Sequence, residues 1–209
     1  MASGARSRGR EEYGLEFSRI VAFSDGVFAI AITLLVLQLD VPLHAGSGHE
    51  LATALRGDGD DLLAFGISFA VIGRFWWRHH AFYGEVVRFD ARLVAFNFTY
   101  LAFVVLIPFT SDLLGRYGDQ SVAVAIYAID LALVILVSVG MVEYALRAGL
   151  TREGMEDEIR RGRNGALYAA AVFLASIPIA FVAPSQAPLF WLLLVLDPTD
   201  RRGRHRAPS

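Results

Sequence analysis

Residues 19–25 read Arg-Ile-Val-Ala-Phe-Ser-Asp, and an apolar run follows them from Gly26 to Leu39. An apolar run of this kind is a candidate membrane span, and an ionisable residue kept inside a span is costly enough to indicate a function. Over all 209 residues, 55% are hydrophobic and 19% are charged, which does not suit a soluble domain. The sequence therefore predicts an all-α integral membrane protein.

Apolar segments recur along the whole chain. They cover about residues 20–39, 62–82, 93–114, 122–146, 166–183 and 187–196. The first five have spanning length at the rise of about 1.5 Å per residue of an α-helix. The sixth ends at Asp197-Pro198, so it crosses only if it borrows flanking residues or tilts within a thinned bilayer. We predict six transmembrane helices.

The positions of the basic residues predict the orientation, because such residues concentrate on the cytoplasmic side of a membrane. With the N-terminus inside, 17 of the 19 basic residues, all of them arginine, lie in cytoplasmic segments, and only Arg56 and Arg116 lie outside. We therefore expect a multi-pass protein of the cell membrane with both termini cytoplasmic. Its predicted parts are a cytoplasmic N-terminus (1–18), a six-helix transmembrane domain (19–197) and a basic cytoplasmic tail (198–209).

Residues that the chain lacks exclude several functional classes. It has no cysteine, which excludes disulfides, thiolate metal sites and cysteine nucleophiles. It has no lysine either, which a P-loop requires, and no His-x-x-x-His or Gly-x-Ser-x-Gly motif. A formal charge of -2 does not favour nucleic-acid binding. We expect no enzyme activity, no catalytic or metal-binding residues, no cofactor and no nucleic-acid partner.

Four apolar residues of the first segment share one face of a helix, within about 60° of one another. They are Phe23, Ile30, Leu34 and Leu37. This stripe either packs against a neighbouring helix or lines a hydrophobic pore, since apolar constrictions can narrow a conduction path. Thr33 lies beside it and either bonds its own backbone or, in a symmetric oligomer, contributes to a ring of hydroxyls.

Asp25 lies about 140° from Ile30 around the same helix, so we expect it to face other helices. A buried carboxylate needs hydrogen-bond donors. At the predicted inner end, the second and third segments supply five: Trp76, Trp77, His79, His80 and Asn97. The tryptophans suit interfacial anchors equally well. Arg19 either joins these groups or lies at the inner mouth, and Asp130, inside the fourth segment, has no evident partner.

The pattern Arg19-x-x-x-Phe23-Ser24-Asp25, with Trp-Trp-Arg-His-His at 76–80, resembles the signature of the transmembrane protein 175 family, potassium channels without the usual pore loop. Asn97, Leu106-Ile-Pro-Phe and Ala125-Ile-Tyr-Ala extend the resemblance to about residue 127. It implies a homotetramer of six-helix subunits in the lipid bilayer, with a central pore lined by the first helix and potassium as the permeant ion.

Carried over residue by residue, the resemblance puts Ile30, Leu34 and Leu37 at the pore constriction and Thr33 at a layer that favours potassium. It puts the residues of the signature in a polar network with the second helix: Arg19, Phe23, Ser24 and Asp25, with Trp76, His79, His80 and Asn97. The alternative is a proton- or cation-coupled secondary carrier, which would use Asp25 or Asp130 as its coupling site.

Overall fold

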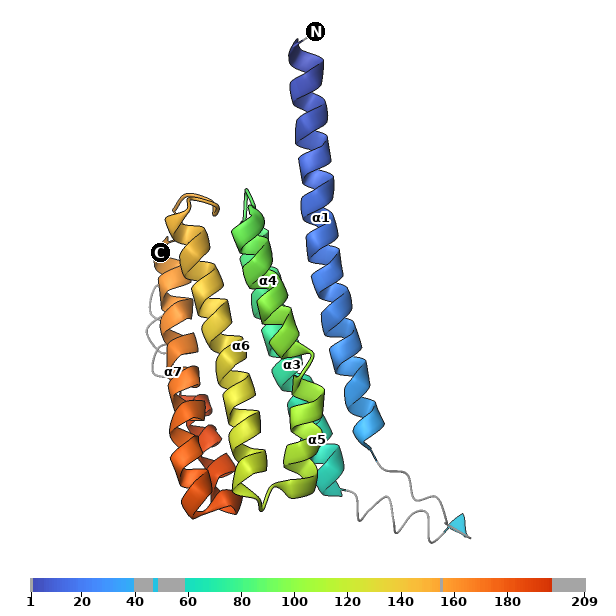
Figure 1. Cartoon of the computed structure of the whole chain (residues 1–209), viewed down its shortest axis with the longest axis vertical. Helices are drawn as coiled ribbons and strands as arrows, with labels where there is room; N and C mark the ends of the chain where they lie inside the picture. Colours follow the sequence, from blue (N-terminus) through green and yellow to red (C-terminus); the bar gives the residue numbers. More distant parts are fainter. Residues whose placement is uncertain (1, 40–46, 49–58, 155, 197–209) are drawn as a thin grey trace, which may run out of the picture.

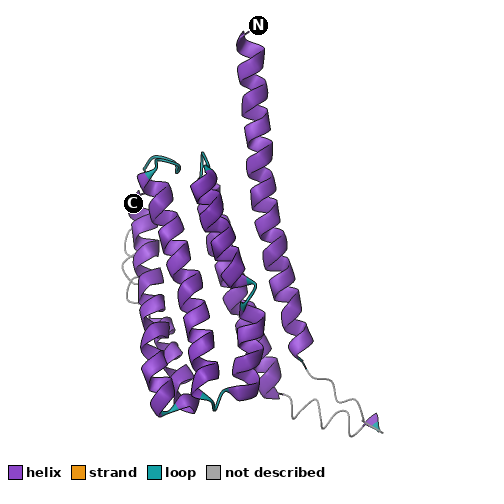
Figure 2. Ribbon diagram, in the orientation of Figure 1, coloured by secondary structure: helices purple, strands orange, loops and turns teal. Residues whose placement is uncertain are grey.

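The computed structural model describes residues 2–39, 47–48, 59–154 and 156–196, and these form helices joined by loops (Figures 1 and 2). The prediction of an all-α protein is confirmed. The elements, in chain order, are α1 (Ala2–Leu34), the 3-10 helix η1 (Leu35–Gln38), α3 (Gly59–Glu85), α4 (Ala91–Val104), α5 (Ile107–Tyr117), α6 (Ser121–Arg147), α7 (Glu156–Val182) and the 3-10 helix η2 (Pro184–Leu196).

Four helical stretches among the described residues are long and apolar enough to cross a membrane. They are Gly14–Gln38, Ala91–Tyr117, Ser121–Arg147 and Gly162–Val182. These correspond to the first, third, fourth and fifth predicted segments. The second predicted segment lies within α3, and the sixth forms η2.

The third predicted segment is broken into two helices, α4 and α5. Pro108 stands in the first turn of α5, and it has no N–H to donate to the carbonyl of Val104 four residues before it. The helix therefore ends at Val104, and Leu106 N bonds Phe103 O at 3.0 Å across the break. As a result, α5 is a separate helix of 11 residues.

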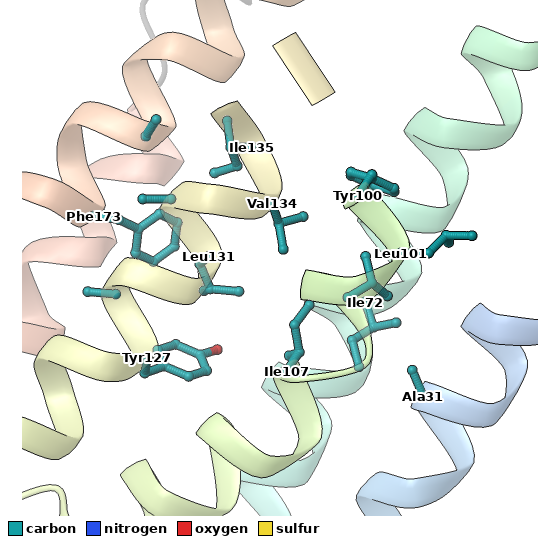
Figure 3. Packing of buried hydrophobic residues seen from close by; sticks show 14 of the residues in the cluster. Ala31, Ile72, Tyr100, Leu101, Ile107, Tyr127, Leu131, Val134, Ile135 and Phe173 are labelled. Atoms are coloured by element: carbon teal, nitrogen blue, oxygen red, sulfur yellow. The ribbon is translucent and has the colours of Figure 1, made fainter. Parts of the chain in front are cut away.

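The core lies around α6, which packs against α4 and α5 on one side and α7 on the other (Figure 1). Figure 3 shows Leu131, Val134 and Ile135 of α6 between Ile107 of α5 and Phe173 of α7, all of them buried. Lipid is as apolar as these side chains, so close packing and interhelical hydrogen bonds hold such a bundle together. By contrast, α1 lies at the edge of the bundle and its N-terminal part extends beyond it (Figure 1).

The short η2 is anchored by its aromatic and backbone groups. The indole of Trp191 packs against Tyr127 at 5.2 Å and Phe173 at 5.5 Å between ring centroids, and its Nε1 donates to Ser176 Oγ at 3.0 Å. Tyr168 donates to Leu193 O at 3.0 Å. In Figure 1 this segment lies along only the lower part of α7.

The loops at the end of α3 and the end of α6 are tied together. Val87 N and Arg88 N both donate to Leu150 O, at 2.8 and 3.2 Å. Gly149 takes the left-handed conformation, with φ of 64°, that lets the chain turn after α6. The two bonds to Leu150 O hold the loop before α4 against the loop after α6.

Asp90 connects α4 to α6 at this end. It caps α4 by accepting from Leu93 N at 2.9 Å, and its other oxygen accepts from the Tyr144 hydroxyl. The bond from Tyr144 lowers the pKa of the Asp90 carboxyl below its ordinary value, and the bond from Leu93 adds to the effect. The carboxylate therefore stabilises the fold fully above the unfolded pKa of about 3.9. That contribution is lost as the pH falls through the folded value.

Asp90→Asn keeps an oxygen for the cap but does not titrate. We expect its thermal unfolding midpoint in detergent to fall less than that of the wild type when the pH is lowered from neutral into the range of the Asp90 pKa. Asp119→Asn, at an exposed position, is the control, and its unfolding midpoint should fall as much as that of the wild type. An equal loss in all three chains would show that Asp90 does not contribute.

Candidate functional site

The predicted stripe on α1 is uncovered in the single chain. Phe23, Ile30, Leu34 and Leu37 are 50%, 58%, 40% and 75% exposed. The opposite side of the helix is buried in the bundle through Ser24, Phe28, Ala31 and Leu35. Phe23 has one ring contact with α4, through Phe98, but Ile30, Leu34 and Leu37 remain largely uncovered by the described helices of their own subunit. We call Phe23, Ile30, Thr33 and Leu34, together with Leu37 of η1, the open face of α1.

Thr33 lies on the open face and is exposed. Its hydroxyl donates to Ile30 O at 2.8 Å, which is the local bond that an intrahelical threonine usually makes. The hydroxyl has one hydrogen and two lone pairs. Donation to the backbone therefore leaves the oxygen able to accept a bond or contact a cation.

Asp25 lies on the side of α1 that faces α3, as predicted. Trp76 Nε1 donates to Asp25 Oδ1 at 2.9 Å, in a half-buried position. Trp76 therefore does more than mark an interface, because its indole N–H holds α1 to α3. Its ring also packs against His80, with centroids 5.5 Å apart.

Asn97, on α4, bonds to α1 and α3 at once. Its Nδ2 donates to Ser24 Oγ at 3.0 Å, and its Oδ1 lies 2.8 Å from His79 Nε2. Ser24 Oγ in turn donates to Ile20 O at 3.0 Å. All three side chains are at least 97% buried.

All three printed bonds are satisfied together by one order of the hydrogens, which begins with the bond from Ser24 to Ile20 O. Ser24 gives its single hydrogen to the backbone, so it must accept from the amide nitrogen of Asn97. The amide oxygen then faces His79, so His79 Nε2 carries a hydrogen and donates it. We call this buried sequence of bonds, from His79 through Asn97 and Ser24 to Ile20 O, the polar chain.

The expectation that five groups gather around Asp25 is wrong in its details. Of those five, Trp76 bonds Asp25, whereas Asn97 bonds Ser24 and His79 bonds Asn97. His80 and Trp77 are exposed, because consecutive residues on a helix diverge by about 100°. Arg19 is also exposed, on the side of the open face, and Phe23 packs against Phe98 with centroids 5.4 Å apart.

Two further contacts were not expected from the sequence. The Gln38 side chain, at the end of η1, donates to Pro108 O in the first turn of α5. Asp130 has a partner, Thr110, whose hydroxyl lies 2.9 Å from Asp130 Oδ2. The only sequence signal for the Gln38 contact was a polar residue at the end of an apolar run. Nothing in the sequence pairs Thr110 with Asp130.

Comparison with known proteins gives one family. The family described as the endosomal/lysosomal potassium channel TMEM175 matches residues 19–108. A potassium channel of Streptomyces collinus is 38% identical over 143 residues, which are 66% of this chain and 66% of that protein. A potassium channel of Chamaesiphon minutus is 42% identical over 117 residues, 54% of this chain and 58% of that one. The matched part thus spans less than two thirds of the length of these relatives.

Solved structures extend the likeness over the fold. The crystal structure of a lysosomal potassium-selective channel TMEM175 homologue from Chamaesiphon minutus has a TM-score of 0.73 and 29% identity, and the match covers 90% of this chain and 98% of that one. A variant of the potassium channel MtTMEM175, solved in complex with a nanobody fusion protein, has a TM-score of 0.67 at 21% identity, which supports the fold alone. The endosomal/lysosomal proton channel TMEM175 of the rat is 34% identical over 113 residues, only 23% of that protein.

Asn97→Ala should destabilise the protein, because it leaves the His79 N–H and the Ser24 oxygen buried without the amide. Each such group costs about 1–3 kcal/mol. The free energy of unfolding in detergent measures the loss. Asn164→Ala removes the same side chain from an exposed position and should change stability by less than about 0.5 kcal/mol. Equal effects of the two variants would contradict the role of the polar chain.

Proposed function

The chain belongs to the TMEM175 family, and we propose on this premise that it is a potassium channel through which K⁺ moves passively across a membrane. The observation that carries the proposal is the open face of α1. This apolar surface is uncovered although the same helix is held firmly on its other side. No cofactor is needed for passive conduction.

A pore requires several such faces around an axis, and one subunit offers a single one. We therefore propose a homotetramer with cyclic symmetry, in which the first helix of each subunit faces the axis. Ile30, Leu34 and Leu37 would then form stacked apolar collars. Such collars resist wetting, and their width controls conductance.

Thr33 would add a ring of hydroxyls between these collars. Hydroxyl oxygens near the axis can replace part of the hydration shell of a permeating ion. The bond from Thr33 to Ile30 O supports this role, since it fixes the side chain while leaving oxygen lone pairs unused. We assign selectivity for potassium to this residue.

The polar chain and the Asp25–Trp76 bond would keep the pore helix in its rotational setting. A helix that turned by one residue would move every side chain by about 100° and take the collars off the axis. Ser24 and Asp25 of the signature thus act on the side away from the pore, through Trp76, His79 and Asn97. Arg19 and Phe23 lie on the exposed side, and His80 supports the Trp76 ring.

For the arrangement in the membrane, we propose six crossings per subunit, with η2 completing the sixth, and both termini in the cytoplasm of a cell-membrane protein. The distribution of the arginines supports this orientation. The lipid bilayer and three further copies of the chain are the partners. The runner-up is a carrier coupled to protons or cations, which a flux measurement separates from a channel.

Purified protein in vesicles should release K⁺ when a membrane potential is applied with no pH gradient, and native mass measurement should give a tetramer. A carrier that couples K⁺ to protons would respond to an imposed pH gradient as well. Strictly monomeric protein in lipid would exclude the proposed pore.

Thr33→Val has a similar volume but no oxygen, so we expect a lower ratio of potassium to sodium permeability with the tetramer intact. The reversal potential under bi-ionic conditions measures the ratio. Thr99→Val is the matched control, because Thr99 is also exposed and bonds its own helix backbone, at Ala95 O. A reversal potential unchanged by Thr33→Val would count against the hydroxyl ring.

A further inference from the structure

A second group of buried polar side chains lies away from the polar chain, between α3, α5 and α6. Its members are Ser68, Thr110, Ser111, Tyr127 and Asp130, each at least 94% buried. Ser68 Oγ and Ser111 Oγ are 2.5 Å apart, and the Tyr127 hydroxyl lies within reach of Ser68. Neither the signature motif nor the open face involves these residues.

Asp130 has fewer hydrogen bonds than an ionised carboxylate needs. Its Oδ2 lies 2.9 Å from the Thr110 hydroxyl, while its buried Oδ1 has no partner among the residues that the structure describes. An ionised carboxylate accepts through both oxygens and is costly to bury without a counter-charge. Inside a membrane helix the cost is greater still.

The groups around Asp130 supply no positive charge. The side chains from α3 and α5 are the hydroxyls of Ser68, Thr110 and Ser111, and α6 adds the Tyr127 hydroxyl one turn away. The charged pair on α5, Asp112 with Arg116, is partly exposed and bonded within itself at 2.9 Å. Within the described part of the chain, no arginine or histidine forms an ion pair with Asp130.

The single hydroxyl hydrogen of Thr110 indicates the protonation state of Asp130. The Thr110 hydroxyl lies within hydrogen-bonding distance of two oxygens, Ile107 O at 3.2 Å and Asp130 Oδ2 at 2.9 Å. It has a single hydrogen and cannot donate fully to both. Both contacts are satisfied when Asp130 is a carboxylic acid that donates to Thr110, and Thr110 donates to Ile107 O.

We propose that Asp130 is a proton-binding site, and that loss of its proton to water changes conduction by moving α5 and, with it, the Gln38 end of the pore helix. The second half of this inference rests on the proposed function. When the proton leaves, Asp130 becomes a carboxylate that must take the hydrogen of Thr110. The bond from Thr110 to Ile107 O, in the first turn of α5, is then lost.

The route from this site to α1 is short. Pro108 lies next to Ile107 and accepts the amide of Gln38, which is the last residue of η1. Because α5 is separate from α4, its first turn can shift without bending a continuous helix. Leu34 and Leu37 of the open face lie shortly before Gln38, so a shift of this turn acts on the proposed constriction.

The protonation of Asp130 is tested by infrared difference spectroscopy. Raising the pH from mildly acidic to alkaline should remove the C=O stretch of a buried carboxylic acid from the wild-type spectrum. Asp130→Asn should lack this band, and Asp112→Asn, the control on α5, should keep it. If the wild type and Asp130→Asn lose the same bands, Asp130 does not release a proton over this pH range and the proposal is overturned.

If Asp130→Asn does not assemble, Thr110→Val gives an independent readout. Removal of the hydroxyl takes away the acceptor of the acid, so the band should move to higher frequency, and an unshifted band would overturn the assignment. A band that disappears at constant pH on addition of Na⁺ or K⁺ would identify a metal cation as the occupant. That result would also overturn the proposal.

The coupling is tested by K⁺ flux in vesicles as a function of pH. The flux through the wild type should change over the pH range in which the band is lost. Asp130→Asn should lose this dependence, and Asp112→Asn should keep it. A pH-independent wild type, or the same dependence in Asp130→Asn, would overturn the coupling. No K⁺ flux in any of the three proteins would contradict the proposed function, and the infrared result would still decide the proton site.

Discussion

The polar chain from His79 through Asn97 to Ser24 fixes the place of α1, and the rest of the arrangement follows from it. Between helices in lipid there is no hydrophobic driving force, so a helix at the edge of a bundle is held by packing and hydrogen bonds. One side of α1 is uncovered, which leaves its inner side to supply these contacts. The bonds from α3 and α4 to Ser24 and Asp25 therefore determine which residues face outward.

The first span, Gly14–Gln38, is held in different ways near its two ends. At the signature, buried side chains bond one another and exclude alternatives, because any unpaired group there is costly. At the other end, Gln38 reaches a single backbone carbonyl of α5. The buried bonds at the signature can hold the rotation of α1 fixed, whereas the single bond of Gln38 can change more easily. The direction of the open face and the position of its Gln38 end are therefore controlled by different contacts.

The helical class and most of the apolar helical segments could be predicted from the sequence, since apolar segments reflect the bilayer directly. The family resemblance added pore-lining roles for residues of the first helix. The exposure of Ile30 and Leu37 is consistent with these roles but does not test them. Individual partners could not be predicted. Ser24 and Asp25 diverge by about 100°, so a small rotation of α1 decides which of them Asn97 meets. The pairing of Thr110 with Asp130 depends on how α5 packs after its break, and helical periodicity says nothing about that.

The fixed direction of the hydrogens in the polar chain has a consequence for sequence change. With His79 protonated on Nε2 and Ser24 donating to Ile20 O, a flipped Asn97 amide would turn its N–H groups toward the N–H of His79 and its oxygen toward the oxygen of Ser24. The identities of the three residues thus depend on one another. A single replacement leaves a buried partner unmatched, whereas joint replacement by apolar residues of similar shape is far less costly. Drift at these sites should proceed by concerted exchange.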